Sequence, residues 1–126
     1  MNHGQKIKSF EDLNAWKEAR SLVIMVYNST RSFPKDEVFG LTNQIRRAAI
    51  SITSNIAEGF SRQSYKDKIQ FYGIALGSLT ELQSQLITAK DISYLIKEEF
   101  AKLNNQSIVA HKLLSGLIKS SKLRNS

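Results

Sequence analysis

The sequence contains no cysteine, which excludes a disulfide-stabilised scaffold, thiolate metal sites and a cysteine nucleophile. Only one proline and six glycines occur in 126 residues, so long helices are expected. No run of eighteen apolar residues occurs, and the polar first nine residues lack the apolar core of a signal peptide. We therefore expect a cytoplasmic protein that does not span a membrane.

The composition that remains is that of an ordinary globular domain with excess positive charge. Hydrophobic residues make up 41% of the chain and charged residues 23%, and no alternating β-branched runs indicate strands. The formal net charge is +7 and the pI is about 9.8. Such a surface favours phosphate-rich partners, nucleic acid ahead of anionic membrane, although excess lysine can also serve solubility alone.

One stretch, residues 39–62, organises the rest of the chain. Its apolar residues recur at steps of three or four, which places them on one face of an α-helix. They are Leu41, Ile45, Ala48, Ile52, Ile56 and Gly59. We expect this helix to open at Asp36, after the breaking pair Phe33-Pro34, and to end close to Gly59.

Three further helices are predicted around this one. They span about residues 10–31, 65–90 and 98–119. Ser9 and Ser64 have the spacing of N-caps for the first and third helices of the chain. Short connections make consecutive helices antiparallel neighbours. The sequence therefore predicts an all-α protein, a single domain over residues 1–126 folded as an antiparallel up-down-up-down four-helix bundle, with flexible tails at 1–9 and 120–126.

Two features need more packing surface than one thin bundle offers. The first helix has two adjacent apolar stripes, one through Trp16 and the other through Ala19, which predicts a wide buried face. In the third helix Gly73 and Gly77 each cost roughly 1 kcal/mol relative to alanine. We expect another backbone to pack closely on these glycines, from the same chain or from a second subunit.

A polar cluster in residues 39–62 has two interpretations. Asn55 and Glu58 fall near the predicted inner edge of the bundle. Buried polar groups there need hydrogen-bond partners and can fix the register of the helices. We expect this structural role, with Glu58 in an ion pair, and direct contact with a ligand is the alternative.

Basic residues gather on the second helix and around its junction with the third. The candidates for phosphate contact are Arg46, Arg47, Arg62, Lys66 and Lys68. The last residues are also basic, through Lys119, Lys122 and Arg124. Aromatic residues between the cations, such as Phe60, Tyr65 and Phe71, are suited to stacking on unpaired bases. The pattern matches no recognised nucleic-acid motif, so a solvated charged face is the alternative.

Catalytic and metal-binding patterns are not found in the sequence. The two histidines, His3 and His111, have no glutamate three residues before them, so the ligand pattern of a di-iron bundle is missing. There is neither a nucleophile elbow nor a glycine-rich phosphate loop. We expect a protein that is not an enzyme and that binds no metal or cofactor.

Three blocks of residues support a resemblance to a known family. The first block is Phe10-Glu11-Asp12-Leu13, Trp16, Ala19, Tyr27 and Phe33-Pro34. The second and most specific is Gly40-Leu41, Gln44, Arg46-Arg47-Ala48-Ala49, Ser51-Ile52 and Asn55-Ile56-Ala57-Glu58-Gly59. The third is Ala75, Gly77-Ser78-Leu79, Glu81-Leu82 and Tyr94-Leu95. In these blocks the chain resembles the four-helix-bundle proteins encoded in intervening sequences of bacterial 23S ribosomal RNA genes. It departs from that family at Thr53, where proline is frequent, so a kink in the second helix is not carried over.

The resemblance implies an antiparallel four-helix bundle that assembles into a homopentameric ring. It also implies similarity to the accessory protein of diversity-generating retroelements, a basic barrel that works with a reverse transcriptase. The family has no catalytic residues to transfer. We therefore expect a non-enzymatic, oligomeric nucleic-acid-binding protein, with RNA ahead of DNA as the partner. The alternative is a protein-interaction scaffold or accessory subunit for a partner enzyme such as a reverse transcriptase.

Overall fold

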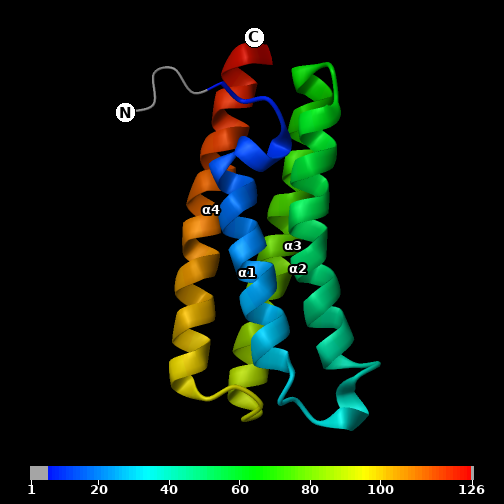
Figure 1. The fold of residues 1–126 in the computed structure, drawn as a ribbon, viewed down its shortest axis with the longest axis vertical. Helices are drawn as coiled ribbons and strands as arrows, with labels where there is room; N and C mark the ends of the chain where they lie inside the picture. The colour runs from blue at the N-terminus through cyan, green and yellow to red at the C-terminus, as the bar shows by residue number, and fades with distance from the viewer. Residues whose placement is uncertain (1–5, 126) are drawn as a thin grey trace.

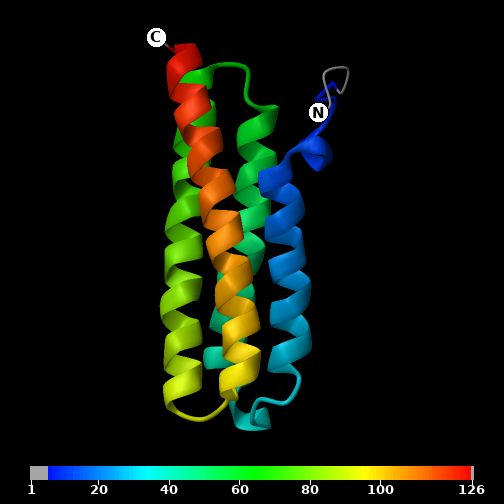
Figure 2. The same ribbon diagram turned by 90° about the vertical axis from the view of Figure 1, so that its left-hand side faces the viewer.

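In the computed structural model, which describes residues 6–125, the chain forms four long helices. They are α1 (Asn14–Thr30), α2 (Leu41–Ser61), α3 (Tyr65–Asp91) and α4 (Lys97–Asn125). Each helix packs against the next, and α4 returns to α1, so the four enclose one core (Figure 1, Figure 2). No strand occurs among residues 6–125. The predicted antiparallel four-helix bundle is confirmed.

The core follows the apolar stripe of α2. Ile45, Ile52 and Ile56 are fully buried, and Ala48 is 5% exposed. The heptad positions of α3 and α4 close the core from the other side, through Leu79, Leu86, Leu103, Ala110 and Leu114. Burial of a leucine or isoleucine side chain stabilises the fold by about 1.5–3 kcal/mol. The 3.6-residue period of the sequence therefore predicts this core correctly.

α1 buries only one of its two predicted stripes completely. Ala19, Leu22 and Val26 are fully buried, whereas Tyr27 on the other stripe is 36% exposed. Trp16, also on that stripe, packs against the edge of the core. The wide apolar face of α1 is thus only partly covered within one chain.

Both predicted N-caps are present. The Ser9 hydroxyl and the Asp12 carboxylate form a capping box, but it caps a short 3-10 helix, η1 (Phe10–Asp12), and α1 begins after that turn. The Ser64 hydroxyl accepts a hydrogen bond from the backbone N–H of Asp67 at the start of α3 (3.1 Å). The local sequence signal therefore predicts the positions of the caps, although not the break between η1 and α1.

The predicted start of the second helix is wrong. A separate 3-10 helix, η2 (Lys35–Glu37), occupies that position, and α2 begins at Leu41. The Glu37 carboxylate accepts a hydrogen bond from the Leu41 N–H (3.2 Å), so Glu37 satisfies a free donor at the start of α2 rather than forming its first turn.

The predicted end of the fourth helix is also wrong. Helical structure continues past Lys119 to Asn125. Ser121 is 3% exposed and its hydroxyl donates to the Leu117 carbonyl (2.8 Å), so the last turns of α4 pack onto the bundle. Of the predicted tails, residues 1–5 and Ser126 lie outside the described residues.

The glycines of α2 and α3 differ in their surroundings. α2 ends at Ser61, close to Gly59 as predicted. A Cβ at Gly59 would lie 2.7 Å from the ring of Tyr72, so glycine permits the close approach of α2 and α3. At Gly73 and Gly77 a Cβ would meet nothing within 4 Å. Close packing on these two glycines from the same chain is therefore wrong, and packing from a second subunit stays a prediction.

The two ends of the bundle differ in character. At one end the Tyr94 hydroxyl donates to the Glu37 carboxylate (2.8 Å), which ties the α3–α4 connection to η2. This hydrogen bond raises the pKa of Tyr94 above its ordinary value. At the other end η1, the α2–α3 junction and the last turns of α4 lie together (Figure 1).

Candidate nucleic-acid interface

The five predicted phosphate-binding residues fall into two groups. Arg46 and Arg47 lie in the second turn of α2, whereas Arg62, Lys66 and Lys68 lie at the α2–α3 junction. Arg46 and Arg62 are therefore about 24 Å apart along the helix axis. The structure does not bring all five residues into one patch.

Arg46 is held between α1 and α2. Its Nε donates to the Thr30 hydroxyl (2.9 Å), and its guanidinium lies over the Tyr27 ring, 4.6 Å from the ring centre. The Thr30 hydroxyl donates in turn to the Val26 carbonyl (2.8 Å), so it links the backbone of α1 to the Arg46 side chain of α2. The side chain fixes the packing of α1 against α2, a role that the sequence pattern did not indicate.

Arg47 points away from that contact. Successive helical residues differ by about 100° in direction, so the neighbouring arginine is exposed on another side of α2. Within residues 6–125 it makes no hydrogen bond or ion pair, and it borders a shallow pocket that also contains Glu81. Its guanidinium is thus available to a ligand.

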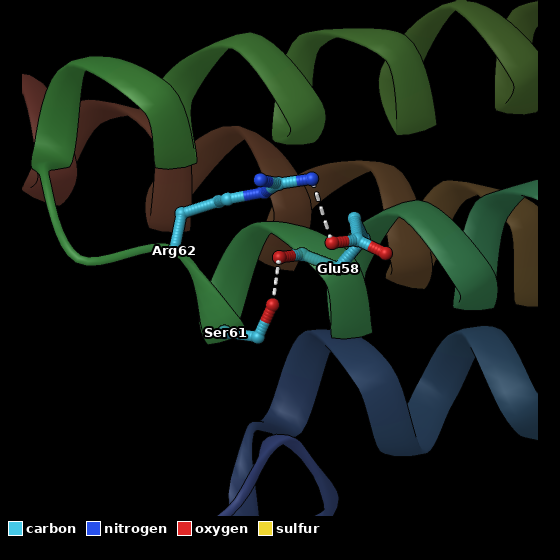
Figure 3. Close-up of polar contacts among 3 residues, drawn as sticks. All are labelled: Glu58, Ser61 and Arg62. Carbon is cyan, nitrogen blue, oxygen red and sulfur yellow. Dashed lines mark hydrogen bonds and ion pairs between the residues drawn. The ribbon is translucent and has the colours of Figure 1, made fainter.

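Arg62 and Glu58 form an ion pair across one turn at the end of α2 (2.8 Å; Figure 3). The Arg62 guanidinium also lies 4.5 Å from the centre of the Phe71 ring. Both charged side chains are nearly half exposed, so water screens the pair and its contribution to stability is small. Glu58 is ion-paired as expected, but it lies on the surface rather than at the inner edge of the bundle.

Asn55 makes a separate set of contacts. Its Nδ2 donates to the carbonyl and the hydroxyl of Ser51 (2.8 and 3.0 Å). The Ser51 hydroxyl lies 2.8 Å from that of Ser78, across the seam between α2 and α3. Asn55 thus supports a polar link between two helices, and it does not form one cluster with Glu58.

Lys68 makes contacts within the chain, as Arg46 does, whereas Lys66 is exposed, as Arg47 is. The Lys68 Nζ donates to the Phe60 carbonyl in the last turn of α2 (2.6 Å), which satisfies a free acceptor there. It also lies over the rings of Phe60 and Tyr65, at 5.2 and 5.8 Å from their centres. Lys66 is exposed and, within the described residues, has no partner.

Arg124 lies in α4, although residues 120–126 were predicted to be a flexible tail. Its Nη1 donates to the Tyr65 hydroxyl (3.2 Å), which brings the C-terminal turn of α4 to the α2–α3 junction. A helix end is difficult to predict here because polar, basic residues give no apolar period. The result is a basic end of the bundle, which we define as Arg62, Lys66, Lys68 and Arg124.

Neither a metal-binding cluster nor a membrane-spanning helix occurs in the part of the chain that the structure describes. No group of three or more histidine, aspartate and glutamate side chains in residues 6–125 is arranged to hold a metal ion. None of the helices in that range is long and apolar enough to cross a bilayer.

The comparison with known protein families decides the identity of the chain. The profile of the 23S rRNA-intervening sequence protein family matches residues 11–116. The chain belongs to this family. The family profile covers all of α1, α2 and α3 and most of α4, so it includes all five predicted phosphate-binding residues but not Arg124. No curated protein matches the chain.

A solved structure supports the same assignment for this 23S rRNA-intervening sequence protein. It is the crystal structure, at 1.70 Å resolution, of a protein of unknown function from the S23 ribosomal protein family of Bacteroides thetaiotaomicron. The two chains are 27% identical, with a TM-score of 0.76 over 83% of this chain and 95% of that one. The resemblance found in the sequence is thus confirmed for family and fold.

Proposed function

We propose that this 23S rRNA-intervening sequence protein is a non-enzymatic, homo-oligomeric nucleic-acid-binding protein, with RNA ahead of DNA as its partner. The observation that carries the proposal is the basic end, where cations are ordered on aromatic rings. Arg62 lies on Phe71, Lys68 on Phe60, and both Lys68 and Arg124 on Tyr65. Cations neutralise phosphates, and rings beside them stack on unpaired bases.

Charge supports the same proposal at long range. The formal net charge of +7 is carried by a chain of only 126 residues. A ring of five copies would carry five times that charge and would attract RNA strongly at low salt. The family is named for proteins of 23S ribosomal RNA intervening sequences, and a gene in such a place would bring the protein close to an RNA partner.

Salt dependence of RNA binding tests the proposal. Arg47→Gln and Lys66→Gln each remove an exposed cation without an internal partner. Each should weaken binding to any RNA sequence and reduce the slope of log K against log salt by about one. Lys112→Gln, an exposed lysine on α4, is the matched control and should leave the slope unchanged. Equal effects of all three substitutions, or binding that does not depend on salt, would contradict the proposal.

A second candidate function, a scaffold for a partner enzyme, has its own supporting observation. Phe39 is 92% exposed and Val38 beside it is 49% exposed, in the segment before α2. A large exposed aromatic side chain of this kind is frequent at protein interfaces. Recovery of one specific protein from nuclease-treated lysate, lost in Phe39→Ser, would favour the scaffold over RNA binding.

A further inference from the structure

A pocket of about 320 Å³ opens at the basic end of the bundle. It lies between η1, the α2–α3 junction and the last turns of α4, and apolar carbon from Leu13, Phe60 and Leu117 lines it. Its volume is at the lower end of the range found for small-ligand sites. The pocket therefore has room for one compact ligand with an apolar or aromatic body.

The charged groups of this pocket are all positive. Lys68 and Arg124 belong to its lining, and no acidic residue occurs among the described residues that line it. Within residues 6–125 each makes one hydrogen bond, Lys68 to the Phe60 carbonyl and Arg124 to the Tyr65 hydroxyl. Two N–H donors of the ammonium and four of the guanidinium remain for a ligand. The rim of the pocket thus favours a phosphate.

Tyr72 supplies a polar group inside the pocket. Its side chain is 2% exposed, and within the described residues its hydroxyl has no hydrogen-bond partner. Burial raises the pKa of Tyr72 to about 12, so at neutral pH the hydroxyl keeps its proton and can both donate and accept. The hydroxyl itself keeps contact with solvent in the pocket, so a polar atom of a ligand can replace water there.

We infer that this pocket accepts one unpaired nucleotide of an RNA strand. The base lies against the Phe60 ring and meets the Tyr72 hydroxyl, and the phosphate contacts Lys68 and Arg124. The volume suits a single nucleotide, and a base within a duplex cannot enter without leaving its stack. This inference rests on the proposed RNA binding and adds to it a preference for single strands.

Two substitutions test the pocket directly. Tyr72→Phe removes the hydroxyl but keeps the ring, and it should weaken binding of a short single-stranded oligoadenylate about threefold to tenfold. Ser120→Trp places a bulky ring at an exposed position of α4 that borders the pocket and should abolish the preference for single strands. Binding of the duplex form of the same oligonucleotide should not change in either variant. A fluorescent adenine analogue in the strand reports insertion of the base.

Matched variants separate the pocket from general effects. Asn105→Trp adds the same bulk at an exposed position elsewhere on α4 and should leave the single-strand preference intact. Lys66→Gln, outside the pocket, should weaken single and double strands equally. Thermal unfolding followed by circular dichroism establishes that each variant is folded.

The outcomes distinguish this inference from the proposal on which it rests. Salt-dependent binding of both RNA forms that Tyr72→Phe and Ser120→Trp leave unchanged would overturn the pocket and keep the RNA-binding proposal. A protein that binds neither form would overturn both. Adenosine monophosphate that binds as tightly as the strand, with the same sensitivity to Tyr72→Phe, would assign the pocket to a free nucleotide and overturn the RNA strand as its source.

Discussion

Gly59 shows how much a single residue decides in this bundle. Its missing Cβ lets α2 approach the Tyr72 ring of α3, and the nearest ring atom would lie only 2.7 Å from a Cβ. An alanine there must displace a buried aromatic ring. Tyr72 also lines the pocket at the basic end, so the packing of α2 on α3 and the candidate site share this side chain.

Gly59→Ala should therefore destabilise the protein despite the higher helix propensity of alanine. Overpacking costs typically about 1–3 kcal/mol, and the propensity gain offsets up to about 1 kcal/mol. We expect a net loss of about 1 kcal/mol in the free energy of unfolding by urea. Gly116→Ala, where a Cβ would meet nothing within 4 Å, is the control and should be neutral or stabilising. A Gly59→Ala protein as stable as the wild type would contradict the close contact.

Tyr72 also predicts how stability changes with pH. Its pKa is raised from 10.0 to about 12 by burial, so the folded state prefers the protonated phenol. The corresponding stability is fully present below pH 10 and is lost as the pH rises toward 12. Between about pH 9 and about pH 11 the wild type should lose about 1 kcal/mol more of its free energy of unfolding than Tyr72→Phe does. Equal losses in the two proteins would show that Tyr72 titrates normally.

At the scale of single residues, the sequence predicts which side chains are buried better than it predicts their hydrogen-bond partners. The positions of Ile45, Ile52 and Ile56 follow from their spacing alone, because a helical face has a fixed period. The contact of Arg46 with Thr30 depends on how α1 lies against α2, which no local pattern encodes. For the same reason the sequence did not predict the capping of α2 by Lys68.

At the scale of the elements, the four helices are predicted correctly, but the start of α2 and the end of α4 are not. Turn chemistry decides each end: Glu37 interacts with the start of α2 without being helical with it. The C-terminal turns of α4 carry few apolar residues, yet Ser121 is buried and Arg124 contacts α3. A pattern based on apolar period cannot recognise a helical segment that packs through small and polar side chains.

Removal of residues 120–126 should lower stability, because these turns are part of the bundle. We expect a loss of about 1–2 kcal/mol in the free energy of unfolding, measured by urea denaturation. Arg124→Gln in the full chain removes only the hydrogen bond to Tyr65 and should cost less. A truncated protein with unchanged stability would contradict the packing of the last turns.

At the scale of the whole molecule, the single chain leaves surfaces uncovered. Gly73 and Gly77 face open space on α3, and one apolar stripe of α1 is only partly buried. A helical glycine lowers the stability of the protomer, and at Gly73 and Gly77 no close packing within the chain compensates for that loss. Packing of a neighbouring subunit on α3 would compensate for it, and a homopentamer is the assembly that we propose.

Gly77→Leu should therefore disturb the proposed assembly, because its side chain would fill the space in which we propose that a neighbouring subunit packs. We expect a shift from oligomer to protomer in sedimentation velocity, with the helical content unchanged. Gly116→Leu, at an exposed glycine of α4, is the matched control and should remain assembled. An oligomer that persists in Gly77→Leu would show that α3 does not form the interface.

The most direct test of a basic, oligomeric RNA-binding protein is the molar mass of the full chain in solution, by light scattering, with and without a structured RNA at low salt. We predict a mass of five protomers of 14.2 kDa each, and a heavier complex when RNA is added. A protein that elutes as a single 14.2 kDa protomer, with a mass that RNA leaves unchanged, would contradict the account.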